Sequence, residues 1–277
     1  MKKSIVWLAS YPKSGNTWTR VFLANYLMNA QQPVPINQVH RFGMGDSIAQ
    51  AYRMVGGPNI DVTDMNVTLP LRARVLRGIV ANNADVNFVK THNTRVPVFG
   101  HTLIPDAVSR SGIYIIRNPL DMLLSYARHF GMTHEATAEA IGRDDNANTP
   151  DDHNVWQFLG SWSEHVRSWT QPSAFPVLTL RYEDLLAAPE ENFGKLLRHI
   201  GITVDDERLA RAVRHASFDE LTKQESATGF VESSPKSEKF FARGKSDQWK
   251  TDLAPAIAKK VKRDHRKVMK KFGYLDE

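Results

Sequence analysis

The sequence contains no cysteine, which excludes disulfide bonds, thiol catalysis and metal sites built on cysteine. It also lacks any run approaching the roughly 20 apolar residues that span a bilayer. The apolar stretch after Met1-Lys2-Lys3 stops at Tyr11-Pro12-Lys13, and no small-residue cleavage site follows it. That stretch is too short for the core of a signal peptide. We therefore expect a soluble, cytoplasmic protein with no membrane partner.

No internal repeat, low-complexity tract or long Gly/Ser linker interrupts the 277 residues. The length fits one large α/β domain or two small ones, and without a visible boundary we predict a single domain over residues 1–277. The net charge of +6 suits a polyanionic ligand and could also suit nucleic acid. Much of the positive charge falls near the C-terminus, where residues 259–271 fit a solvated basic helix as well as a functional patch.

Four short apolar segments are typical of buried strands: residues 5–9, 87–90, 112–116 and 177–180. Helical patterns separate them, which favours an α/β fold with a parallel sheet flanked by helices. Helices are predicted after residue 15, at about 70–82, after Asn118-Pro119, at 152–169 with Asp152 as its cap, from 182, at 189–199, at 205–215 and at about 255–272. Three tryptophans, Trp156, Trp162 and Trp169, are predicted to lie in the core.

Three segments carry no recognisable motif and are expected to wall a ligand pocket: about 31–68, 131–150 and 223–240. The first is expected to be irregular, and residues 223–239 are expected to be a loop.

The first strand and the turn after it favour an anion site. Strand, small-residue turn and helix direct backbone N–H groups and a helix N-terminus at a bound anion. The turn is not a Walker A sequence, since Lys13 precedes Gly15 instead of following the last glycine. An ordinary strand–helix turn with an incidental lysine is the alternative.

Polar residues also follow the other predicted strands: Lys90 to His92, Arg117, and Arg181 with Tyr182. In proteins with a parallel sheet, ligands bind beyond the carboxyl ends of the strands, which is where these residues fall. A histidine there could be a general base, since its unperturbed pKa near 6.5 leaves it mostly neutral at pH 7, although most histidines are surface or structural residues. A phosphate could touch both Arg117 and Ser125, because Ser125 lies two helical turns beyond Asn118. Alternatively, Arg117 pairs with a carboxylate and Ser125 only packs.

Residues 11–18, Tyr-Pro-Lys-Ser-Gly-Asn-Thr-Trp, resemble the 5′-phosphosulfate loop of the sulfotransferases that use 3′-phosphoadenosine 5′-phosphosulfate (PAPS). Phe88-Val-Lys-Thr-His92 resembles the family's strand end, whose histidine deprotonates the acceptor. Residues 117–125 match its R-N-P-x-D-x-x-x-S site for the 3′-phosphate. Tyr182-Glu-Asp-Leu185 and Ser217-Phe218 resemble segments near the nucleotide, although Asp184 could simply cap a helix, as we expect.

Residues 240–250 resemble the family's C-terminal nucleotide loop, F-x-R-K-G-x-x-G-x-W-K, but depart from it at Ala242 and Asp247. The family's dimer motif would start at Lys250 and is not matched, because Ala254-Pro255 replaces Thr-Val and Lys259 replaces Glu. The oligomeric state is therefore left open. The overall pattern is most similar to bacterial small-molecule sulfotransferases, such as those that act on glycopeptide antibiotics.

The resemblance implies a sulfotransferase with a P-loop-like 5′-phosphosulfate loop. It would move the sulfuryl group of PAPS to a hydroxyl of a small-molecule or natural-product acceptor, leaving 3′-phosphoadenosine 5′-phosphate (PAP), with no metal. The implied catalytic residues are His92 as base, Lys13 and Ser125. The implied nucleotide-binding residues are Lys13, Ser14, Gly15, Asn16, Thr17, Trp18, Arg117, Ser125, Tyr182, Phe218, Arg243, Gly244 and Lys245. The alternative is a P-loop kinase or NTPase. A nucleic-acid binder using the basic C-terminal helix is a third class, but no groove-reading motif is visible, so no nucleic-acid partner is expected.

Overall fold

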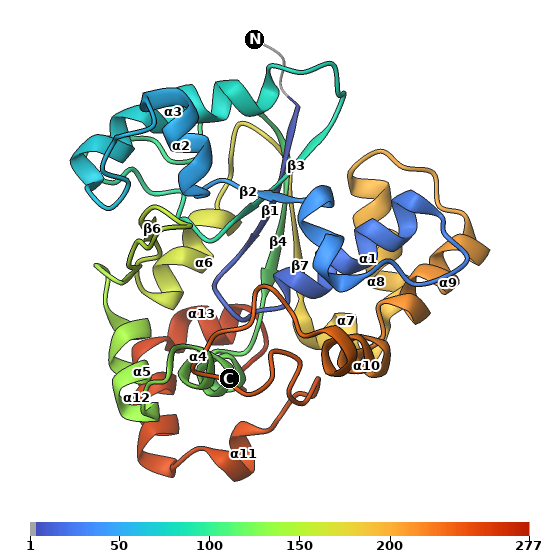
Figure 1. Ribbon diagram of the computed structural model, residues 1–277. Helices are drawn as coiled ribbons and strands as arrows, with labels where there is room; N and C mark the ends of the chain where they lie inside the picture. Colours follow the sequence, from blue (N-terminus) through green and yellow to red (C-terminus); the bar gives the residue numbers. More distant parts are fainter. Residues whose placement is uncertain (1–3, 277) are drawn as a thin grey trace.

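A computed structural model describes residues 4–276, and within them five parallel strands form one sheet in the order β2-β3-β1-β4-β7 (Figure 1). The strands are β1 (Ile5–Ser10), β2 (Met44–Gly45), β3 (Asn87–Thr91), β4 (Ser109–Ile116) and β7 (Val177–Arg181). The predicted α/β fold with a parallel sheet is confirmed. The edge strand β2 was not predicted, because two residues are too short to form a hydrophobic pattern.

Alternation along β1 divides the core between the two faces of the sheet. Ile5, Trp7 and Ala9 contribute to one apolar cluster, whereas Val6 and Leu8 contribute to the other. The first cluster lies under α3 (Met65–Val80), α4 (Pro119–Phe130), α5 (His134–Gly142), α6 (Trp162–Thr170), α12 (Pro255–Asp264) and α13 (Arg266–Lys271). The second lies under α1 (Asn16–Met28), α8 (Pro189–His199), α9 (Asp206–His215) and α10 (Phe218–Thr228). Figure 1 shows these two groups of helices on opposite sides of the sheet.

The remaining elements connect or cover this frame. They are the 3₁₀ helix η1 (Ile36–Phe42), the helices α2 (Ala49–Gly56), α7 (Tyr182–Ala187) and α11 (Trp249–Asp252), and an antiparallel pair, β5 (Ala147–Asn148) and β6 (Gln157–Phe158). Segments 31–68 and 131–150 are thus partly regular. No helix within residues 4–276 is both long enough and apolar enough to cross a membrane.

The helix predicted at 152–169 is wrong in its first half. Residues 157–158 are extended and pair with β5, and α6 begins only at Trp162, where the Ser161 side chain accepts a hydrogen bond from the Glu164 N–H. Asp152 therefore caps nothing. Trp162 and Trp169 are fully buried as predicted, but Trp156 lies outside the core and its indole donates to the Thr63 carbonyl.

The single helix predicted at 255–272 is two helices. Buried His265 separates α12 from α13, and its Nδ1 lies 2.8 Å from the Ser163 hydroxyl of α6. Two other boundaries also move. The helix predicted from about residue 70 begins at Met65, capped by Asp64, and residues 223–228 belong to α10, so the loop begins at Gly229.

Candidate functional site

The turn between β1 and α1 has the backbone shape of an anion-binding loop. Lys13 and Gly15 both have left-handed conformations, with φ of 66° and 109°. Such turns direct successive N–H groups to one side, and the N-terminus of α1 follows immediately. Gly15 has a second reason to be glycine, because a Cβ there would lie 2.9 Å from the Tyr182 ring. The loop therefore rests directly against Tyr182, the first residue after β7.

Two buried polar atoms beside this loop have no partner among the described residues: the Ser14 hydroxyl and Arg117 Nε. Arg117 donates from Nη1 to the Lys13 carbonyl at 3.0 Å, and its guanidinium lies 4.3 Å from the centroid of the Tyr182 ring. An anion at the loop would supply acceptors for such donors. The residues therefore fit a bound phosphate.

A cavity of about 790 Å³ opens over the carboxyl ends of the strands. Every predicted site residue except Ser14 and Lys245 lines it. Ser14 is fully buried within the turn between β1 and α1, and Lys245 follows Gly244 in the C-terminal loop; neither lines the cavity. Two predicted residues also have structural side-chain roles: Asn16 donates to the Leu8 carbonyl, and the Trp18 indole donates to the Ala216 carbonyl.

His92 is held in one orientation at the floor of this cavity. Its Nδ1 lies 2.8 Å from the Ser10 carbonyl oxygen. A carbonyl can only accept, so Nδ1 carries the proton and Nε2 carries the free lone pair. Burial, followed by the charge of Lys90, lowers the pKa of His92 to about 3. The imidazole is therefore neutral at physiological pH.

Lys13 lies at the other side of the cavity floor, under an aromatic ring. Its ammonium is 3.5 Å from the centroid of the Phe240 ring. Burial, followed by the charges of Lys90, Arg128 and Arg117, lowers the pKa of Lys13 to about 7. Burial and the neighbouring positive charges together bring the pKa of this lysine close to neutrality.

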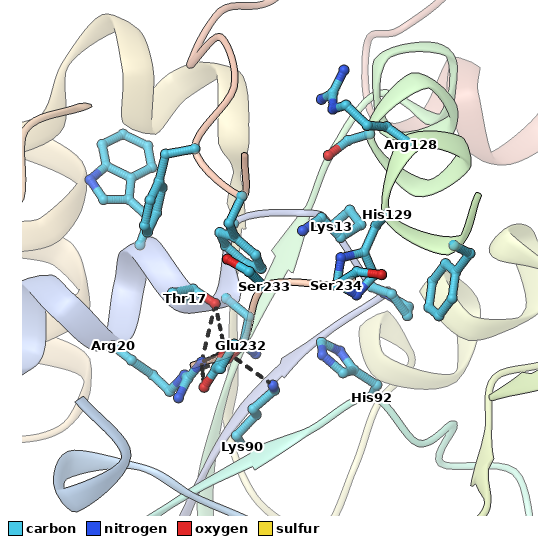
Figure 2. Close-up of a pocket in the computed structure, with 18 of the residues that line it drawn as sticks. Lys13, Thr17, Arg20, Lys90, His92, Arg128, His129, Glu232, Ser233 and Ser234 are labelled. Carbon is cyan, nitrogen blue, oxygen red and sulfur yellow. Dashed lines mark hydrogen bonds and ion pairs between the residues drawn. The ribbon is translucent and has the colours of Figure 1, made fainter. Parts of the chain in front are cut away.

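Glu232 is the main residue that the sequence did not single out. Its carboxylate accepts from Arg20 at 2.6 and 2.8 Å and from the Thr17 hydroxyl at 3.2 Å, and Lys90 lies 3.6 Å away (Figure 2). Burial raises the pKa of Glu232, but the charges of Lys90 and Arg20 outweigh that effect and hold it well below its usual range. Glu232 lies in a loop that matches no motif, so nothing in the sequence marked it as a site residue.

Asp121 fastens the C-terminal loop to the cavity. Its two carboxylate oxygens accept from the Asp247 N–H at 2.7 Å and the Trp249 N–H at 3.0 Å. Asp247 has φ of 63°, a conformation that suits the glycine of the family pattern. The loop keeps its glycine-like backbone despite this departure.

The cavity is closely packed around Gly244. A Cβ on Gly244 would lie 2.3 Å from the Phe218 ring, so only glycine fits there. Arg243 forms an ion pair with Asp252. The prediction that Asp184 caps a helix is wrong, because Arg181 occupies the cap position of α7 and Asp184 lies 3.7 Å from it as an ion-pair partner.

The family model for the sulfotransferase domain matches residues 3–273 of this chain. The chain belongs to the sulfotransferase family. Among characterised relatives, dog (Canis lupus familiaris) sulfotransferase 1A1 is 25% identical over 283 residues, covering 96% of this chain and 83% of the relative. Cytosolic sulfotransferase 12 of Arabidopsis thaliana is 24% identical over 288 residues, covering 98% and 79%. The predicted family and the prediction of a sulfotransferase enzyme are confirmed.

Solved structures share the sulfotransferase fold. Retinol dehydratase in complex with androsterone and the inactive cofactor PAP superimposes with a TM-score of 0.62 at 18% identity, covering 98% of this chain and 82% of that one. Mouse sulfotransferase SULT7A1 complexed with PAP superimposes with a TM-score of 0.62 at 19% identity, covering 97% of this chain and 84% of that one. The narrower prediction of a bacterial natural-product branch is not tested by these relatives and stays a prediction.

Proposed function

We propose that this sulfotransferase moves the sulfuryl group of PAPS to a hydroxyl of a small-molecule acceptor, with His92 as the general base. The observation that carries the proposal is the fixed orientation of His92. Its Nδ1 is tied to the Ser10 carbonyl, which leaves Nε2 as the proton acceptor of a residue that lines the cavity. A base must present a free lone pair to the acceptor hydroxyl, and this tautomer does so without further change.

The donor half of the cavity matches the two ends of PAPS. The backbone of residues 13–17 and the start of α1 would hold the 5′-phosphate. Arg117, Ser125, Arg243 and Gly244 all line the cavity and would hold the 3′-phosphate. Phe218 and Tyr182 would flank the base and sugar.

Transfer leaves negative charge on the oxygen that bridges sulfur and the 5′-phosphate. Lys13 would stabilise that charge, because its ammonium is part of the loop that holds the phosphate. His92 would take the acceptor proton as the new O–S bond forms. Within residues 4–276, no three His, Asp or Glu side chains are grouped to hold a metal ion, and no step assigned to these residues uses one.

Donor binding can be tested before any acceptor is known. We expect 1 mM PAP without metal to raise the melting temperature by several degrees, because a ligand at about 100 times its Kd stabilises the folded state by about 2.7 kcal/mol. ATP with Mg²⁺ should give a smaller shift. A larger shift with ATP and Mg²⁺ than with PAP would instead support a P-loop kinase or NTPase. Differential scanning fluorimetry makes both measurements.

A further inference from the structure

We propose that Arg128 is a third arginine that binds the 3′-phosphate and gives the site its preference for 3′-phosphorylated nucleotides; this rests on the proposed function. Arg128 lies three residues after Ser125 on α4, so the two side chains share one face of the helix. Both line the cavity, as do Arg117 and Arg243. Figure 2 shows both Arg128 and His129 on this helix, with His129 next to Lys13 and the Arg128 side chain directed away from Lys13.

The three guanidinium groups differ in what they already bind. Arg117 donates to the Lys13 carbonyl, and Arg243 is paired with Asp252. The Arg128 guanidinium makes no hydrogen bond or ion pair with any residue from 4 to 276. Arg128 thus retains all its side-chain donors for a planar, two-point contact with a phosphate.

Charge supports the same assignment. Arg128 is solvent-exposed at the cavity rim, and partial burial, followed by the charges of Arg243 and Arg117, lowers its pKa, so the three cations repel one another. A doubly charged phosphate would relieve that repulsion. The C-terminal loop departs from the family pattern at Ala242, and Arg128 supplies positive charge at the end of the cavity that this loop closes.

The test compares PAP with adenosine 5′-phosphate, which lacks the 3′-phosphate, by isothermal titration calorimetry. We expect Arg128→Gln to weaken PAP binding about tenfold and to leave adenosine 5′-phosphate binding within about twofold, since a charge-assisted hydrogen bond contributes about that much. The control is Arg77→Gln, which removes an equal charge from an exposed position on α3, outside the cavity lining. It should leave the affinity for both ligands unchanged.

Equal losses for both ligands, or no loss for PAP, would overturn the assignment of Arg128. Wild-type protein that fails to bind PAP at all would instead overturn the proposed function.

A second, independent observation concerns segment 229–241, which we infer to be a strap that blocks the donor site until PAPS displaces it. Its Glu232 carboxylate occupies Arg20, Thr17 and Lys90, as described above. The ring of Phe240, from the same segment, covers the Lys13 ammonium. One segment therefore contacts three cationic side chains at or near the donor loop, those of Arg20, Lys90 and Lys13.

The strap is anchored outside the cavity. Glu225 of α10 accepts from the Phe240 N–H at 2.6 Å, the Phe241 N–H at 2.9 Å and the Ser233 hydroxyl at 3.3 Å. The Asn37 side chain accepts from the Val231 N–H and donates to the Gly229 carbonyl. Glu232 binds the Thr17 hydroxyl of the loop that would receive the 5′-phosphate, so carboxylate and phosphate compete for it.

Glu232→Gln keeps the shape of the side chain and removes the competing charge, so PAP should bind about tenfold more tightly. Glu225→Gln, which loosens the anchor, should also tighten binding and checks the mechanism if the first variant folds poorly. Glu238→Gln is the matched control, because Glu238 is exposed in the same segment and lies outside the cavity lining. Unchanged or weaker PAP binding by the Glu232 and Glu225 variants, measured by calorimetry, would rule out the strap.

Discussion

Replacing His92 with alanine should reduce the sulfation rate constant about 10³-fold and leave PAP affinity within a few-fold. General bases contribute typically 10²- to 10⁴-fold, and the proton acceptor is lost while the phosphate-binding groups remain. The acceptor hydroxyl would then have only water to take its proton. Single-turnover sulfation with a phenolic or alcoholic acceptor measures the rate constant, and calorimetry measures the PAP affinity.

The comparison variant is His129→Ala. His129 also lines the cavity, and its ring is in edge contact with Phe240, but no hydrogen bond of its ring within residues 4–276 fixes its tautomer. Burial, followed by the charge of Lys13, lowers its pKa to about 4, so it is also neutral. If His129→Ala lost the activity and His92→Ala retained it, the base would be His129.

Replacing Lys13 should lower kcat about 100-fold with a smaller effect on donor affinity. A donor aimed at charge that develops in the transition state contributes about 10²- to 10³-fold to kcat. Because Lys13 has a positive φ of 66°, Lys13→Ala retains a backbone conformation that alanine adopts poorly, whereas Lys13→Gly relaxes it. Both variants lack the ammonium, so equal losses of kcat would assign the effect to charge. An unchanged kcat in both would show that Lys13 only binds the ground state.

The same lysine makes the activity sensitive to pH. Its pKa of about 7 in the donor-free protein means that the ammonium is lost as the pH rises through 7. Since the protonated form stabilises the leaving phosphate, kcat/KM for PAPS should decline above about pH 7. The Lys13→Gly variant should lack this decline. The pKa of His92, lowered to about 3, predicts no loss of its basic form down to about pH 4.

The sequence was informative where residues follow strands. Lys13, His92, Arg117 and Tyr182 could be predicted as site residues from their positions after strands. A parallel sheet brings the carboxyl ends of its strands to one edge, independently of the loop conformations. Helix boundaries were less predictable. Val155, Phe158 and Leu159 have helical spacing, yet pairing with Ala147 and Asn148 holds residues 157–158 extended. Apolar spacing alone cannot distinguish these outcomes over a few residues.

Glu232 and Arg128 could not be found from sequence because their roles depend on long-range packing. Glu232 is 212 residues from Arg20 along the chain, and Arg128 becomes notable only because its neighbours Arg117 and Arg243 already have partners. Lys245 shows the opposite case. It falls within a recognisable motif, yet it lies outside the cavity lining.

The hydrogen bonds from the Asp247 and Trp249 N–H groups to Asp121 have a consequence for folding during synthesis. The donor site joins Lys13, from the start of the chain, to Arg243 and Gly244, more than 220 residues later. During synthesis, the first strands and helices emerge and begin to fold long before that last loop leaves the ribosome. The nascent chain therefore passes most of its translation without a complete site. Full donor recognition arises only when the last eighth or so of the polypeptide, residues 243–277, docks on α4.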